Sequence, residues 1–86
     1  MYKLEVFKQA AKYYGKLDKQ AQRRINKAVD DIIENPHEGS HMKKLKGRLD
    51  GKFRYDIGNL RAIYCIDVDN GIIYLEAIGP RGDVYK

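Results

Sequence analysis

The second half of the chain carries side chains that suit the binding of a phosphodiester. Basic residues surround short β-strand patterns there, and a tyrosine stands one residue from the end; the set is Lys44, Lys46, Arg48, Lys52, Arg54, Arg61, Arg81 and Tyr85. Lysine and arginine neutralise phosphate charge, and a phenol can hydrogen-bond to a nucleotide or stack on it. RNA is therefore the first substrate to consider.

Cleavage of RNA by its own 2′-hydroxyl needs three contributions from such a site. The nucleophile must lose a proton, the crowded phosphorane needs its charge neutralised, and the departing 5′-oxygen must gain a proton. Arginines supply the second contribution, and a basic cleft can hold the backbone in line for attack. A tyrosine is a poor base near neutral pH unless cations lower its pKa, an effect that Arg61 and Arg81 can supply.

Length and composition narrow the field further. The 86 residues form one small domain, 1–86, and Lys plus Arg total 17 against 12 Asp plus Glu, a formal net charge of +5. That surplus favours polyanions, and an acidic protein partner equally well. The single Cys65 excludes an internal disulfide. The N-terminal residues carry no apolar signal segment or membrane span, so we expect a cytoplasmic protein that does not bind a membrane.

Periodicity predicts an N-terminal strand followed by a two-helix hairpin. Alternation over residues 2–6 indicates a half-buried strand, and apolar residues at helical spacing indicate a first helix over 8–16. A second helix begins after Asp18 as its N-cap and ends at Asn35-Pro36, because the residue before proline disfavours helical backbone.

Three strands are predicted after an irregular, strongly basic connection over residues 36–52. Their ranges are 53–57, 60–68 and 72–78, and the turns between them are Gly58-Asn59 and Asn70-Gly71. The predicted fold is α+β, with the N-terminal strand and the helix hairpin packed on a mainly antiparallel, four-stranded sheet.

The two turns also predict which residues face each other. The expected pairs are Ile57–Leu60, Asp56–Arg61, Tyr55–Ala62 and Arg54–Ile63, then Val68–Ile73, Ile66–Leu75 and Tyr64–Ala77. One face is then an apolar core surface that includes Val68 and Ala77. The open face includes Ile78 and presents Arg54 and Arg61 on adjacent strands. A slip of one residue would reverse the two faces, and the clean segregation supports this register.

Several segments, taken in order, resemble the RelE branch of the RelE/ParE toxin superfamily. They are Asn35-Pro36, Leu45-Lys46-Gly47, the run from Phe53 to Tyr64, and the run from Gly79 to Tyr85. The resemblance covers essentially the whole chain. It implies a RelE-like toxin of a type II toxin–antitoxin system that cleaves mRNA in the ribosomal A site, inhibits translation and is held off by a cognate antitoxin. It also implies a metal-independent endoribonuclease, acting through the 2′-hydroxyl, with no small-molecule cofactor.

The resemblance also implies roles for four residues. By position, Arg54 matches a basic residue used by the family, and Arg61 matches a phosphate-binding arginine. Arg81 matches a transition-state or acid residue, and Tyr85 matches a C-terminal tyrosine that orients the RNA or stacks on it.

Asp56 departs from the family pattern. Better-studied members carry a second lysine or arginine at this position, thought to act in proton transfer. The expected Asp56–Arg61 pair indicates a salt bridge instead. Either another group transfers the proton, with Lys52 nearest in sequence, or the chemistry is weakened.

The remaining basic residues are predicted to form a surface that binds RNA or the ribosome. They are Lys43, Lys44, Lys46, Arg48 and Lys52. A solvated basic loop without a function explains the same pattern.

The string His37-Glu38-Gly39-Ser40-His41 matches the H-E-x-x-H motif of zinc peptidases. That site needs both histidines on one face of a helix and a third ligand. Here the string follows a helix-ending Asn-Pro, and the chain has no further histidine. We therefore expect no metal site.

Two alternatives to the nuclease stay open. One is a ParE-like toxin that inhibits DNA gyrase; such members generally lack the arginine and terminal tyrosine set, so Arg61, Arg81 and Tyr85 argue against it, while Asp56 leaves it open. The other is a catalytically weak module that binds an antitoxin or another acidic peptide, in a groove or at a sheet edge.

Overall fold

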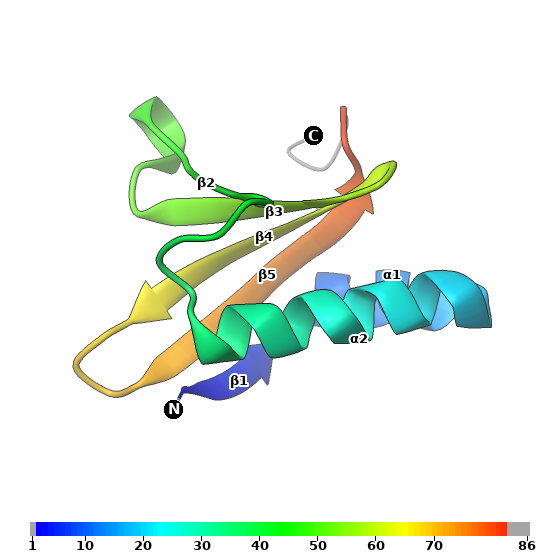
Figure 1. Ribbon diagram of the computed structural model, residues 1–86, viewed down its shortest axis with the longest axis horizontal. Helices are drawn as coiled ribbons and strands as arrows, with labels where there is room; N and C mark the ends of the chain where they lie inside the picture. The colour runs from blue at the N-terminus through cyan, green and yellow to red at the C-terminus, as the bar shows by residue number, and fades with distance from the viewer. Residues whose placement is uncertain (1, 83–86) are drawn as a thin grey trace.

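The computed structural model, which describes residues 2–82, begins with strand β1 (Lys3–Val6) and continues into helices α1 (Lys8–Lys16) and α2 (Lys19–Glu34). The elements that follow are β2 (Met42–Lys44), the 3-10 turn η1 (Gly47–Leu49), β3 (Lys52–Ile57), β4 (Leu60–Asp67) and β5 (Ile72–Pro80). Figure 1 shows α2 lying across the long strands, with β1 beneath it. No helix in the described range is long and apolar enough to cross a membrane.

The strands form one sheet in the order β1-β5-β4-β3-β2. β1 is parallel to β5, and parallel neighbours need a long connection between them, which here includes the helix hairpin. The remaining pairs are antiparallel. The α+β class is confirmed, but the sheet has five strands where four were predicted. β2 was missed inside the supposedly irregular connection, because three residues are too few to show alternation.

The helices form where capping and apolar spacing predict them. The Asp18 carboxylate accepts a hydrogen bond from the Ala21 backbone N–H at 2.8 Å, which starts α2 as an N-cap does. The helix ends at Glu34, next to Asn35-Pro36. Its buried residues are Ile25, Ala28 and Ile32, and Ala10 is the buried residue of α1.

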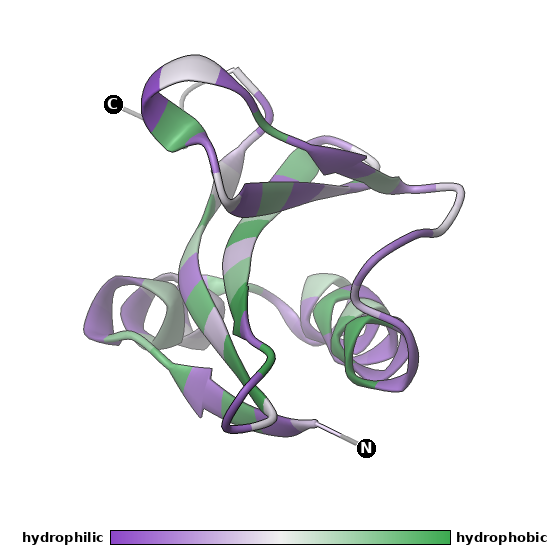
Figure 2. Cartoon of the chain, turned by 90° about the vertical axis from the view of Figure 1, so that its left-hand side faces the viewer, coloured by the Kyte–Doolittle hydropathy of each residue, from purple (hydrophilic) through white to green (hydrophobic). Residues whose placement is uncertain are grey.

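Both helices contribute to the apolar cluster that covers one face of the sheet. Its strand members are Tyr55, Leu60, Ala62, Tyr64, Ile73, Leu75 and Ile78. Bands of hydrophilic and hydrophobic residues alternate along the long central strands in Figure 2, as expected for a sheet with only one face in the core. The Tyr55 hydroxyl donates to Asp31 at 2.8 Å, and burial, together with that carboxylate, raises the pKa of Tyr55 to about 12.

The first hairpin has the predicted register. Ile57 faces Leu60, Asp56 faces Arg61, and the remaining predicted pairs follow. Gly58 has a φ of +57°, and Asn59 does not share this left-handed backbone, a pattern that fits a type II′ turn. This tight turn leaves no room for another register.

The second hairpin does not have the predicted register, which is off by two residues. Asp67 pairs with Ile72 and encloses a four-residue loop, so Ile66 faces Ile73. The Asp67 carboxylate causes this difference, because it accepts the Asn70 backbone N–H at 3.1 Å and the Asn70 side-chain N–H at 2.8 Å. The same hydrogen bonds lower the pKa of Asp67. Val68, predicted to lie in the core, is 62% exposed in this loop.

A β-bulge then reverses the faces at the end of β5. Tyr64 faces Leu75 but Ile63 faces Ala77, so Glu76 is an extra residue. Ile78 consequently enters the core at 1% exposure, whereas Ala77 had been predicted there. Burying the isoleucine removes more apolar surface from water than burying the alanine would.

Gln9 holds the edge of β5 beyond the end of β1. Its side-chain amide donates to the Ile78 carbonyl at 3.2 Å and accepts from the Ile78 N–H at 3.1 Å. The Gln9 side chain therefore makes the two backbone hydrogen bonds to β5 that a further residue of β1 would make.

We predict that Tyr64→Phe lowers the free energy of unfolding by about 1–2 kcal/mol. Tyr64 is 0% exposed, and its hydroxyl donates to the Pro36 carbonyl at 2.8 Å. The substitution leaves that carbonyl without its partner. Urea unfolding measures the change, and Tyr74→Phe, at a half-buried tyrosine for which the described residues offer no hydroxyl hydrogen bond, is the control. An equal effect in both variants would contradict this account.

Candidate functional site

The β3–β4 hairpin gathers charged side chains on the sheet face opposite the core. Arg54 and Asp56 are two residues apart on β3 and therefore point to the same side. Arg61 faces Asp56 across the ladder. The predicted placement of Arg54 and Arg61 together on the open face is confirmed.

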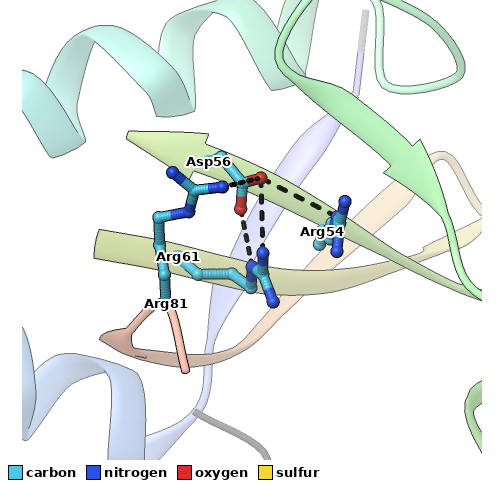
Figure 3. A network of polar contacts seen from close by, with 4 residues as sticks. All are labelled: Arg54, Asp56, Arg61 and Arg81. Carbon is cyan, nitrogen blue, oxygen red and sulfur yellow. Dashed lines mark hydrogen bonds and ion pairs between the residues drawn. The ribbon is translucent and has the colours of Figure 1, made fainter. Parts of the chain in front are cut away.

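Three arginines meet at the Asp56 carboxylate (Figure 3). Arg61 Nε donates to Asp56 Oδ1 at 2.6 Å, and Arg61 Nη2 donates to Oδ2 at 3.4 Å. Arg54 Nε and Arg81 Nη2 each lie 3.8 Å from the same Oδ2 atom. The last two distances are ion pairs rather than hydrogen bonds.

Arg81 reaches this site because its backbone is tied to the first hairpin. Its N–H donates to the Asn59 carbonyl at 3.1 Å, directly after β5 ends at Pro80. The Arg81 side chain is 55% exposed, whereas the Arg61 side chain is 10% exposed. The site therefore has one buried cation at its base and one accessible cation at its rim.

The charges in this cluster are unbalanced. Among residues 2–82, three guanidinium groups face one carboxylate, so this described set has a net charge of +2. Burial alone would raise the pKa of Asp56, but the Arg61 hydrogen bonds and the charges of Arg61, Arg54 and Arg81 outweigh burial and lower it. Asp56 is therefore ionised at neutral pH and is a weak proton acceptor.

The chemistry open to this cluster is anion binding. Guanidinium groups match the geometry of phosphate oxygens, and convergent cations stabilise charge that develops on phosphorus. Arg54 Nε is buried and has no hydrogen-bond partner in the described part of the chain. A donor of this kind is available to a bound oxyanion.

The predicted basic surface is divided by β2. Lys43 faces Arg54 in the β2–β3 ladder, so it projects from the same face as the arginines. Lys44 faces Phe53, which packs against the core, and therefore lies on the other side. Lys46 and Arg48 are exposed on the connection to β3 and on η1.

Lys52 does not join the arginine cluster. It stands four residues from Asp56 along β3, roughly 13 Å away at strand spacing, and forms an ion pair with Glu76. Glu76 also accepts a hydrogen bond from Cys65 Sγ at 3.2 Å. Burial first, and then Glu76, raise the pKa of the Cys65 thiol to about 11, which keeps the thiol protonated and unreactive.

The other predicted residues lie elsewhere. Tyr85 is outside the described residues, so its role stays a prediction. The His37–His41 string lies in the turn after α2 rather than on a helix, and His37 Nε2 lies 3.3 Å from the Tyr2 hydroxyl.

A second surface feature was not predicted from the sequence. An apolar groove of about 440 Å³ lies on the core side of the sheet; its lining residues are Leu4, Val6, Ala10, Ala11, Tyr14, Ile25, Asn26, Val29, Asp30, Leu75 and Ile78. These residues come from α1, α2 and two strands that are distant in sequence. Periodicity identified most of them as apolar, but it does not show whether an apolar side chain packs in the core or lines an open groove.

Comparison with known proteins identifies the family. A sequence profile described as "ParE-like toxin of type II bacterial toxin-antitoxin system" matches residues 4–86. The chain belongs to this family. The resemblance to RelE/ParE toxins seen in the sequence is thereby confirmed, and the chain is a toxin of the type II toxin–antitoxin class.

Solved structures of RelE/ParE toxins share this fold. A chain of the archaeal RelE–RelB complex from Pyrococcus horikoshii is 26% identical with a TM-score of 0.80, covering 96% of this chain and 98% of that one. A chain of the intact E. coli RelBE complex is 18% identical with a TM-score of 0.81, covering 93% of this chain and 96% of that one. The Agrobacterium tumefaciens YoeB/ParE toxin is 18% identical with a TM-score of 0.82, covering 92% of this chain and 98% of that one. A search of curated protein sequences gave no significant match.

We predict that Asp56 stabilises the ParE-like fold in a pH-dependent manner. The folded-state pKa of Asp56 lies below its ordinary value. Its stabilisation is therefore fully present above the unfolded pKa of about 4 and is lost as pH falls through the folded value. Asp56→Asn should lower the free energy of unfolding by about 1–3 kcal/mol near pH 7. The difference from wild type should shrink as pH falls below about 4 and through the folded-state pKa, because the wild-type carboxyl is then protonated as well.

Urea unfolding at a series of pH values, from neutral down to the acid limit of the fold, measures this difference. Asp69→Asn removes an exposed carboxylate in the β4–β5 loop and serves as the control. A wild-type-to-Asp56→Asn difference that stays constant across this range would show that the charge of Asp56 does not stabilise the fold.

Proposed function

We propose that this toxin is a ribosome-dependent endoribonuclease that cleaves mRNA in the A site and so inhibits translation. The convergence of Arg54, Arg61 and Arg81 on one anion position carries the proposal. These three residues come from β3, β4 and the end of β5, so a folded domain is needed to assemble them. A scissile phosphate gains charge on its non-bridging oxygens during attack, and convergent guanidinium groups stabilise that charge.

The proposed reaction uses the 2′-hydroxyl of the RNA as nucleophile. The 2′-oxygen bonds to phosphorus as its proton leaves, and the bond from phosphorus to the 5′-oxygen breaks as that oxygen gains a proton. Arg61 holds the phosphate from the base of the site, and Arg54 adds a second cation. Arg81, at the exposed rim, stabilises the phosphorane or assists the leaving oxygen. Tyr85 orients or stacks on the RNA, as the family resemblance implies.

The ribosome supplies what this site lacks. With Asp56 ionised, the described cluster holds three cations and no effective base. Holding the 2′-hydroxyl in line with phosphorus lowers the barrier without an additional base, and a structured decoding site can impose that geometry. Lys43, Lys44, Lys46 and Arg48 would bind the surrounding RNA, with Lys43 adjoining the arginine face. Lys52 contributes less, since Glu76 neutralises it.

We predict that Arg81→Ala reduces mRNA cleavage about 10²- to 10³-fold, because it removes a cation from the transition state. Primer extension on a defined mRNA in programmed ribosomes measures the cuts, with Tyr85→Phe tested beside it. Arg23→Ala, at an exposed position on α2, is the control and should retain wild-type cuts. Intact mRNA in the presence of folded wild-type toxin would overturn the nuclease proposal.

A gyrase-inhibiting activity is the second candidate. It is favoured by the family description, which is ParE-like, and by the similarity to the YoeB/ParE toxin. Inhibition of DNA supercoiling by purified gyrase, with no mRNA cuts on ribosomes, would establish it in place of the nuclease. A toxin with neither activity would be the weak binding module.

We further propose a cognate antitoxin as the protein partner. The family description places the toxin in a toxin–antitoxin system, and the similar P. horikoshii and E. coli structures are complexes of RelE with RelB. The groove between α1 and α2 offers about 440 Å³ to the apolar face of an antitoxin segment.

We predict that Ala11→Glu weakens antitoxin binding at least about 10-fold, because it places a charge in an apolar interface. Ala11 lines the groove and is exposed, so the fold should tolerate the change. Calorimetric titration with the cognate antitoxin measures the affinity. Gln20→Glu, an equal charge change on α2 outside the groove lining, should bind as wild type does. Undiminished affinity in Ala11→Glu would place the antitoxin elsewhere.

A further inference from the structure

We propose that Asp56 is a built-in competitor for the substrate phosphate. Its carboxylate occupies the position at which the three arginines would hold a phosphodiester, and it weakens the binding of RNA in that way. The inference rests on the proposed function, since it takes an RNA phosphate as the ligand of this site. It adds that the toxin carries its own substitute anion.

The geometry of one oxygen atom is the first support. Asp56 Oδ2 lies 3.4 Å from Arg61 Nη2 and 3.8 Å from both Arg54 Nε and Arg81 Nη2. Three guanidinium groups from three different strands or strand ends thus converge on a single acceptor (Figure 3). Convergence of cations on one point is the arrangement that an oxyanion site requires.

Incomplete hydrogen bonding is the second support. Of the three arginines, Arg61 alone donates a hydrogen bond to Asp56 within the described residues; Arg54 and Arg81 lie at ion-pair distance. Arg54 Nε is also buried without a hydrogen-bond partner in the described part of the chain. The carboxylate, fixed to β3 by a short side chain, is too small and too restrained to serve all three cations. A phosphodiester has more oxygens and is free to settle among them.

Charge gives the direction of the effect. The described part of the cluster holds three guanidinium groups and one carboxylate, so a phosphate is still attracted while Asp56 is present. The phosphate must share its donors with Asp56 and is repelled by it. Removing one negative charge about 5 Å from a phosphate strengthens binding about fourfold in the dielectric of water, and more in a partly buried site.

The consequence is selectivity for presented RNA. A site weakened by its own carboxylate holds free RNA poorly, while RNA that the ribosome fixes in place pays less entropy on binding and can still displace Asp56 from the arginines. Asp56 would thereby restrict cleavage to the ribosome.

Binding of a non-cleavable RNA tests this inference. The probe is a fluorescein-labelled hexanucleotide with 2′-O-methyl riboses, and fluorescence anisotropy gives its Kd. Asp56→Asn removes the charge but keeps a carbonyl oxygen that can accept from Arg61 Nε. We expect it to bind the probe at least about fourfold more tightly than wild type, with a steeper dependence of log Kd on log salt.

Asp69→Asn is the matched control, because it makes the same chemical change in the exposed loop at the far end of β4. It should change the Kd less than about twofold, as expected for a screened distant charge. Equal or weaker binding by folded Asp56→Asn would overturn the inference and make Asp56 a residue that positions Arg61.

The outcome is separable from that of the nuclease proposal. Ribosomal cuts by wild type, with no tighter probe binding by Asp56→Asn, would overturn the competitor role alone. Tighter binding without cuts by any variant would support the competitor role and remove the nuclease.

Wild-type protein gives a second measurement that does not depend on the variant folding. The Arg61 Nε–H NMR resonance reports the hydrogen bond to Asp56. Saturation with the same probe should move this resonance if phosphate displaces the carboxylate. An unmoved resonance at saturation would overturn the inference.

Discussion

The pairing of Asp56 with Arg61 across the first hairpin is the constraint on which the site depends. The two-residue turn at Gly58-Asn59 fixes that pairing, and a slip of one residue would move Arg54, Asp56 and Arg61 to the apolar face. The same turn positions the third arginine, because the Asn59 carbonyl accepts the N–H of Arg81. One tight turn thus brings together side chains from three parts of the chain.

If Asp56 has the proposed competitor role, this pairing links the stability of the fold to the strength of RNA binding. An arginine that is only 9% exposed needs an anion beside it, since an unpaired buried charge is strongly destabilising. The anion that stabilises Arg61 in the free protein also lies where a phosphate would bind. In that proposed role, a toxin with a basic residue in place of Asp56 would lose one partner of Arg61 and gain a cation, so it would bind RNA more tightly and be less stable. With Asp56 at this position, the chain would have a more stable fold and weaker RNA binding than a toxin with a basic residue there.

The sequence predicted the parts of the fold that local rules decide. The helices and the first hairpin were correct because Asp18, Asn35-Pro36 and Gly58-Asn59 act on immediate neighbours. The second hairpin was wrong because the Asp67 side chain closes a longer loop, which no turn dipeptide reveals. The β-bulge at Glu76 and the three-residue β2 depend on tertiary packing and on a partner strand, respectively.

The candidate site shows the same division. The Asp56–Arg61 pair followed from register, and Arg54 followed from strand alternation. The approach of Arg81 to the same oxygen depends on a backbone hydrogen bond between segments about 20 residues apart, which sequence spacing does not encode.

The apolar groove lies on the helix side of the sheet and the arginines on the other. A partner seated only in the groove would leave Arg54 and Arg81 uncovered, so direct blocking of the proposed RNA site requires the partner to reach around the sheet. Acidic side chains of such a partner would compete for the same guanidinium groups that Asp56 holds, and neutralisation would then add to the competition proposed for Asp56.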